Sequence, residues 1–117
     1  MILLQDHHIT VTARKDGQAE EQAAALRAEG LSAEGLRLDL ANPGDIAHVA
    51  DHIHSQYGRL DALINNASCM PEFDKFSMLD ADIDYVRTAL EVNVVGVWAL
   101  VKATAQLLQA APAARAW

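Results

Sequence analysis

Apolar residues in this chain alternate between short runs and helical spacings. The short runs, rich in leucine and β-branched residues, predict three strands over 9–13, 36–40 and 60–64. Segments with a helical repeat follow each run, and they predict helices over 16–29, 43–57 and 82–108. Strand and helix thus alternate three times, which favours an α/β fold with a parallel sheet and right-handed crossovers.

Capping residues mark the ends of two predicted helices. Asn42-Pro43 combines a side-chain acceptor with proline at the first helical position, which is a strong helix start. Gly58 and Gly30 are suited to end the second and first helices. The last helix is expected to bury a stripe of apolar residues: Val86, Leu90, Val94, Val97, Val101 and Leu108.

Two terminal segments and one loop complete the expected organisation. Residues 2–6 resemble the last turn of a helix, and the alanine-rich segment 110–116 is expected to be a helix end or a tail. Residues 69–80 are rich in Pro, Asp and Ser and are expected to form a loop. The 117 residues suffice for one domain.

Charge and composition argue against several classes of partner. The net charge of −7 and the scattered basic residues, apart from Arg14-Lys15, argue against a nucleic-acid surface. The strongly apolar region 92–101 is about half the length that a bilayer requires, so no membrane partner is expected. The single cysteine, Cys69, cannot form an internal disulfide, which favours a reducing compartment and a cytoplasmic location.

Amide side chains stand at two unusual places. Asn65-Asn66-Ala67-Ser68 directly follow the third apolar run, as expected where a buried parallel strand opens onto a ligand crevice. Asn93 lies within an apolar helical pattern, where a polar side chain needs a partner. Two simpler interpretations stay open: the pair at 65 and 66 could be turn residues, and Asn93 could bond to a backbone carbonyl.

Taken in order, several motifs resemble the short-chain dehydrogenase/reductase family, and most closely its carbonyl-reductase-like branch. They are Val11-Thr12-Ala13-Arg14, Ala28-Glu29-Gly30-Leu31-Ser32, Asn65-Asn66-Ala67 and Asn93-Val94-Val95-Gly96. The resemblance implies that residues 1–117 form a single partial dinucleotide-binding domain, truncated at both ends. The expected fold is a partial Rossmann-like parallel sheet of about three strands with helices on both faces.

The resemblance assigns roles to five residues. Asp39 would accept a hydrogen bond from the adenine amine, and the Leu40 backbone would face the same ring. Asn65 and Ala67 would line the adenosine ribose. Asn93 would be the catalytic-site asparagine that binds a water molecule in the proton relay.

Arg14 points to the cofactor that the family resemblance implies. A guanidinium just beyond the strand 9–13 can pair with the 2′-phosphate of NADP in a planar fork. NAD enzymes usually carry an acid at the strand end, where this chain has Ala13. NADP is therefore the expected cofactor, with NAD the less favoured one.

The sequence also departs from the family pattern. It contains neither the glycine-rich phosphate loop nor a Tyr-x-x-x-Lys motif, because Tyr57 and Tyr85 have no lysine four residues later. Ser68 replaces the glycine of the Asn-Asn-Ala-Gly motif. Without the family's central first strand, either strand 60–64 pairs directly with strand 9–13 or another chain or segment supplies the missing strand. We expect the first, a three-stranded sheet.

These expectations lead to two alternative functions. The first is an NADP-dependent oxidoreductase of carbonyl or alcohol substrates, here a fragment that is inactive alone. The second is a non-catalytic reductase-like subunit or interaction module that forms homo- or hetero-oligomers through the 82–108 helix. No metal is expected, because His48 and His52 have helical spacing but no evident third ligand.

Overall fold

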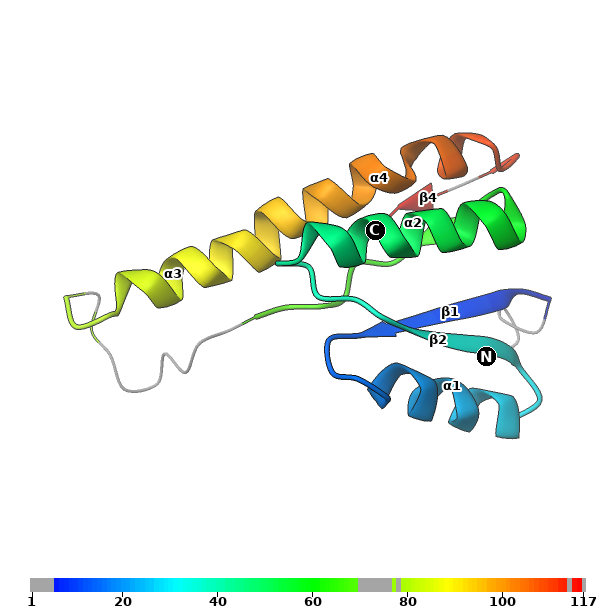
Figure 1. The fold of residues 1–117 in the computed structure, drawn as a ribbon, viewed down its shortest axis with the longest axis horizontal. Helices are drawn as coiled ribbons and strands as arrows, with labels where there is room; N and C mark the ends of the chain where they lie inside the picture. The colour runs from blue at the N-terminus through cyan, green and yellow to red at the C-terminus, as the bar shows by residue number, and fades with distance from the viewer. Residues whose placement is uncertain (1–5, 70–76, 78, 114, 117) are drawn as a thin grey trace. The chain divides into compact units, whose positions relative to one another are not determined.

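The computed structural model describes residues 6–69, 77, 79–113 and 115–116 (Figure 1). The chain divides into two compact units, Met1–Asp39 and Leu40–Trp117, which we describe separately. Both combine helices with a pair of parallel strands, so the predicted α/β class with parallel pairing is confirmed. The prediction of one partial domain over 1–117 stays a prediction.

The first unit is a single strand–helix–strand repeat. It consists of β1 (His8–Ala13), α1 (Gln18–Ala28) and β2 (Ser32–Arg37). The strands are parallel and in register from His8 opposite Ser32 to Ala13 opposite Arg37. The backbone N–H of Leu38 donates to the Ala13 carbonyl at 2.9 Å and extends the ladder by one step. Parallel strands need such a crossover, and α1 supplies it.

Small residues let α1 pack against β2. Ala23 is completely buried and Ala19 nearly so. A Cβ added to Gly35 would lie 2.3 Å from the backbone nitrogen of Glu20 and 2.6 Å from the Ala19 carbonyl oxygen. Glycine is therefore required at this position because the two backbones approach too closely for any side chain.

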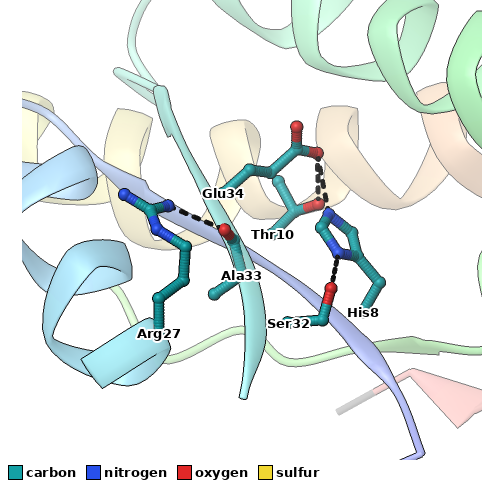
Figure 2. Close-up of polar contacts among 6 residues, drawn as sticks. All are labelled: His8, Thr10, Arg27, Ser32, Ala33 and Glu34. Atoms are coloured by element: carbon teal, nitrogen blue, oxygen red, sulfur yellow. Dashed lines mark hydrogen bonds and ion pairs between the residues drawn. The ribbon is translucent and has the colours of Figure 1, made fainter. Parts of the chain in front are cut away.

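Arg27 ties the end of α1 to β2. Its guanidinium donates to the Ala33 carbonyl at 2.8 Å, as Figure 2 shows, and to the Glu20 carboxylate. The hydrogen bond from Arg27 holds the pKa of the exposed Glu20 carboxyl below its ordinary value. This arginine thus links the helix and the strand through both a carbonyl and a carboxylate.

Polar side chains on the opposite face from Ala33 pair across the strands. His8 Nδ1 lies 2.7 Å from Ser32 Oγ, and Thr10 Oγ1 donates to Glu34 at 2.9 Å (Figure 2). His8 Nε2 also lies 3.6 Å from the same Glu34 oxygen. These are the directly opposed residues of the ladder, so we interpret the cluster as cross-strand pairing that sets the register.

The second unit begins with α2 (Pro43–Tyr57), whose predicted ends are confirmed. The Asn42 side chain accepts from the N–H groups of Gly44 and Asp45 at 2.9 and 3.4 Å. Gly58 ends the helix with a φ of 69°, a left-handed conformation that glycine adopts without strain. The buried face consists of Ile46, Val49, Ala50 and Ile53.

The predicted 82–108 helix exists but is not uniform. It comprises α3 (Ile83–Leu90), the π-helical segment η3 (Glu91–Gly96) and α4 (Val97–Gln109). Together they form a 27-residue helix that is long and apolar enough to cross a membrane by length and composition, criteria that core helices also meet. The expectation of no membrane partner stays untested.

The predicted apolar stripe of this helix is only partly buried, since Val86, Val97, Val101 and Leu108 are half-buried. The buried positions are Gly96, Leu100, Thr104 and Leu107. Leu90 and Val94, both in the predicted stripe, are instead about half exposed, at 54% and 52%. A π-helical turn has more residues than an α-helical turn, so it rotates everything after it relative to a regular repeat. Gly96 lies against the Leu40 backbone, and α4, which follows it, packs beside α2 (Figure 1).

The predicted three-stranded sheet is wrong. β3 (Ala62–Leu63) pairs in parallel with β4 (Arg115–Ala116), so the described residues form two separate two-stranded sheets. The end of the chain predicted as a tail therefore includes a strand. The α3–η3–α4 helix provides the crossover that parallel pairing of β3 and β4 requires, just as α1 does for β1 and β2.

One strand boundary also needs correction. The second strand was expected over 36–40, but β2 spans Ser32–Arg37. Its ladder partner β1 ends at Ala13, so pairing stops opposite Arg37, and Leu38 and Leu40 are buried without belonging to the strand. Most of the predicted helical turn at 2–6 lies outside the described residues, as does much of the loop 69–80.

Gly96 provides a test of the packing in the second unit. A Cβ at this position would lie 2.4 Å from the Leu40 carbonyl oxygen. We expect Gly96→Ala to lower the free energy of unfolding by about 1–3 kcal/mol, the usual range for overpacking. This is the net effect, since alanine in a helix otherwise gains about 1 kcal/mol over glycine.

Urea denaturation monitored by circular dichroism measures this change. Lys102→Ala is the control, because Lys102 is an exposed residue further along the same helix. It should shift the midpoint little. A Gly96→Ala chain as stable as the native chain would contradict the close approach.

Candidate functional site

The first unit places two predicted cofactor residues at one edge. Arg14 directly follows β1, and Asp39 comes two residues after the end of β2. Because β1 and β2 are parallel and in register, their carboxyl ends lie at the same edge of the pair. Ligands of open α/β folds bind at this edge. Arg14 is exposed and Asp39 is half-buried.

Arg37 joins this edge, although the sequence interpretation did not identify it. Its Nε–H donates to the Arg14 carbonyl at 3.3 Å, and the same nitrogen lies 3.4 Å from an Asp16 carboxylate oxygen. The strand was expected to continue to residue 40, which would have placed Arg37 inside it. Only the observed register, with Arg37 opposite Ala13, places it at the strand end.

In the second unit, the Asn93 side chain binds the Cys69 backbone in both directions. Asn93 Oδ1 accepts from the Cys69 N–H at 2.7 Å, and Asn93 Nδ2 donates to the Cys69 carbonyl at 2.8 Å. The amide thus behaves like one step of a strand ladder. These two bonds explain how a polar side chain is accommodated in an apolar helix. The bond to the Cys69 carbonyl agrees with the simpler interpretation that Asn93 bonds to a backbone carbonyl. Its predicted water-binding role stays a prediction.

Asn93 also lies within the π-helical segment η3. Such segments are frequent at functional sites because they alter the helix backbone locally. The side chain leaves the helix there to reach Cys69, which is 24 residues earlier in the sequence. The asparagine that the resemblance singled out therefore has a specific structural partner in this chain.

The Asn65–Ser68 segment connects β3 to this anchor. Asn65 is half-buried, and Asn66, Ala67 and Ser68 are exposed. The segment starts at the carboxyl end of β3 and ends at Cys69, so its two ends are held by a strand ladder and by Asn93. The roles predicted for Asn65 and Ala67 beside a ribose stay predictions.

Leu40 lies next to the same helix segment. Its side chain is buried, and its carbonyl and Cβ occupy the space beside Gly96, three residues after Asn93. Its backbone contact with adenine stays a prediction.

The structure therefore gathers the predicted residues in two groups. Arg14 and Asp39 belong to the first unit, while Leu40, Asn65, Ala67 and Asn93 belong to the second. In the first group, Arg14 and Asp39 come after the carboxyl ends of β1 and β2. In the second, Asn65 and Ala67 come after β3, and Asn93 contacts the end of that segment.

The histidines at 48 and 52 occupy a helix surface of the second unit. His48 is exposed, and the His52 ring meets Tyr57 edge-on with centroids 6.3 Å apart. Within residues 6–69, 77, 79–113 and 115–116, no three His, Cys, Asp or Glu side chains gather as a metal site would require.

Comparison with known proteins identifies the family. A protein-family model described as enoyl-(acyl carrier protein) reductase matches residues 3–115, which is nearly the whole chain. This chain belongs to the short-chain dehydrogenase/reductase family. The resemblance read from its motifs is confirmed.

The chain is similar to known reductases and dehydrogenases, and we describe one of each. Carbonyl reductase [NADPH] 3 of Rattus norvegicus is 32% identical over 76 residues, which cover 65% of this chain and 27% of the relative. L-rhamnose 1-dehydrogenase (NAD(P)(+)) of a Sphingomonas species is 31% identical over 94 residues, covering 80% of this chain and 36% of the relative. The chain thus spans well under half the length of these relatives.

Solved structures agree with the Rossmann-like fold. A short-chain dehydrogenase from Burkholderia cenocepacia in complex with NADP superposes with a TM-score of 0.72 and 28% identity, over 86% of this chain and 40% of that one. A short-chain dehydrogenase from Escherichia coli CFT073 reaches a TM-score of 0.84 at 23% identity, over 97% of this chain and 61% of that one. The second likeness concerns the fold alone.

Replacing Asn93 tests its bonds to Cys69. Asn93→Ala would leave the half-buried Cys69 N–H and carbonyl without this partner, at a cost of about 1–3 kcal/mol. We expect faster hydrogen exchange at the Cys69 amide and a lower free energy of unfolding. Asn93→Asp keeps the acceptor and loses the donor, so its exchange rate and its free energy of unfolding should lie between those of the native chain and Asn93→Ala.

Asn66→Ala is the control for this experiment, because Asn66 lies in the same segment and is exposed. It should leave the Cys69 exchange rate unchanged. Equal exchange rates in the native chain and in Asn93→Ala would show that the two hydrogen bonds do not hold the segment.

Proposed function

We propose that this chain is the adenosine-binding part of an NADP-dependent oxidoreductase that acts on carbonyl or alcohol substrates. The carboxyl edge of β1 and β2 carries the argument. Arg14 follows β1 and Arg37 ends β2, while Ala13 occupies the strand end where NAD enzymes of this family usually carry an acid. A cationic edge of this kind fits the additional phosphate of NADP.

The names of two known proteins support the same cofactor. A carbonyl reductase relative carries NADPH in its name, and a structural relative at 28% identity was solved with NADP. The proposal of carbonyl substrates also rests on the name of this carbonyl reductase. The L-rhamnose dehydrogenase relative, whose name includes both cofactors, is consistent with alcohol substrates as well.

The family resemblance assigns each unit its own residues toward the nucleotide, the first unit Arg14 and Asp39 and the second Leu40, Asn65 and Ala67. Arg14 would form a fork with the 2′-phosphate, and Asp39 would accept from the adenine amine. Leu40 would face the adenine through its backbone, and Asn65 and Ala67 would line the ribose. When bound, NADPH would supply the hydride for carbonyl reduction.

Asn93 would act beside the reaction rather than on the nucleotide. By holding Cys69, it keeps the segment after β3 in place. As the family resemblance implies, Asn93 would also bind the water of the proton relay. Proton transfer in this family uses a Tyr-x-x-x-Lys motif, which these 117 residues do not contain. We therefore propose a role in binding, with no reductase activity from these residues alone.

Two adenosine nucleotides test the cofactor assignment. The chain should bind adenosine 2′,5′-bisphosphate more tightly than adenosine 5′-monophosphate, as measured by isothermal titration calorimetry. We expect Arg14→Ala to weaken bisphosphate binding about tenfold or more, in line with about 1.5–3 kcal/mol for a charge-assisted hydrogen bond. Binding of the monophosphate should change little.

Arg87→Ala is the control, since Arg87 is an exposed arginine on α3 that pairs with Asp84 at 3.1 Å. It should leave both affinities unchanged. Equal affinity of the native chain for the two nucleotides, or no binding of either, would overturn the NADP assignment.

Exposed apolar side chains along the long helix support a second function, self-association. Ile83, Tyr85 and Leu90 on α3, and Val94, Val95 and Trp98 further along the helix, are all about half exposed or more. An apolar surface of this extent is unusual on a monomer. We infer that a second copy of this chain covers these side chains, in an interface formed by the same residues of both copies.

A single substitution tests this interface. Trp98 is 68% exposed, and we expect Trp98→Lys to abolish a concentration-dependent dimer in sedimentation equilibrium, because the contact would then bury an unpaired charge. Leu79→Lys is the control, since Leu79 is 95% exposed and precedes the helix. A native chain that stays monomeric at all concentrations would overturn the proposal.

A further inference from the structure

The edge of the first unit contains an acid close to the proposed phosphate site. Asp16 lies two residues after Arg14, in the connection between β1 and α1. A carboxylate so close to a bound phosphate would repel it, because both groups are negatively charged. An NADP site at this edge therefore requires a group that compensates the charge of Asp16.

Arg37 is placed to do this. Its Nε lies 3.4 Å from the Asp16 carboxylate and 3.3 Å from the Arg14 carbonyl, so one guanidinium contacts both the acid and the backbone of the phosphate-binding arginine. The strand register sets this geometry, because Arg37 is opposite Ala13, the residue before Arg14.

We propose that Arg37 is a specificity-determining positioning residue for the 2′-phosphate. It neutralises Asp16 and holds the backbone of Arg14 at the carboxyl edge of β1. Selectivity for the additional phosphate thus depends on both strands of the first unit, and Arg14 alone does not provide it. This inference rests on the NADP-binding function proposed above.

The expected effect is modest, because the pair is exposed. The side chains of Arg37 and Asp16 are 46% and 93% accessible, so water screens their attraction. We define the selectivity ratio as the affinity for adenosine 2′,5′-bisphosphate divided by that for adenosine 5′-monophosphate. Arg37→Ala should lower this ratio about threefold to fivefold, the range of an exposed charge pair.

A double substitution separates the role of Asp16 from a general loss of charge. In Arg37→Ala/Asp16→Asn the uncompensated carboxylate is gone, so the selectivity ratio should recover most of the native value. Arg37→Lys, which keeps the charge, should retain part of the ratio. A general loss of structure would lower the affinities for both nucleotides equally and leave the selectivity ratio unchanged.

Arg27→Ala is the matched control. Like Arg37, Arg27 contacts a backbone carbonyl and a carboxylate in the first unit, but its partners are the Ala33 carbonyl near the start of β2 (Figure 2) and the Glu20 carboxylate on α1. Its replacement should leave the ratio unchanged. Thermal unfolding of each variant, followed by circular dichroism, shows whether the first unit stays folded.

The outcomes distinguish the inference from the function on which it rests. A native chain that prefers the bisphosphate, with an unchanged ratio in Arg37→Ala, overturns the role of Arg37 and leaves the NADP assignment standing. A ratio that falls equally with and without Asp16 overturns the neutralisation of Asp16, because Arg37 then acts through the Arg14 backbone alone. A native chain without any preference overturns the NADP assignment and this inference together.

Discussion

Parallel pairing of β1 with β2 is the constraint on which the proposed chemistry depends. Parallel strands place their carboxyl ends at one edge, and the in-register ladder sets Ala13 opposite Arg37. This brings Arg14, Arg37 and Asp39 to the same edge although 23 residues separate the two arginines. A shift of the ladder by one residue would reverse the face of every side chain in the strand and separate the groups.

Close backbone contacts determine how helices approach the strands and each other. Gly35 admits the backbone of α1 in the first unit, and Gly96 admits the Leu40 carbonyl in the second. At Asn93, a side-chain amide replaces a strand neighbour by bonding Cys69 in both directions. These contacts need small or hydrogen-bonding residues in places where a larger apolar side chain would have increased hydrophobic burial.

The site follows the family pattern with one addition. The family match covers residues 3–115, and the motifs after the strands agree with it. The additional feature is the contact from Arg37 to Asp16 and to the Arg14 backbone. It connects the end of one strand with the residues after its neighbour, so under the proposed function selectivity for a nucleotide would depend on both strands.

Local sequence signals by themselves determined the helices, the parallel class and the family. Asn42 and Gly58 delimit α2 as predicted, because capping depends on a few neighbouring residues. The sequence alone did not determine the strand partners, since pairing is a long-range contact: β3 pairs with β4, and β2 starts at Ser32 because β1 lies beside it. Nor did it determine the buried side of the long helix, where the π-helical segment rotates the helical repeat. The role of Arg37 likewise became visible only in the tertiary structure, because a distant strand brings it beside Arg14 and Asp16.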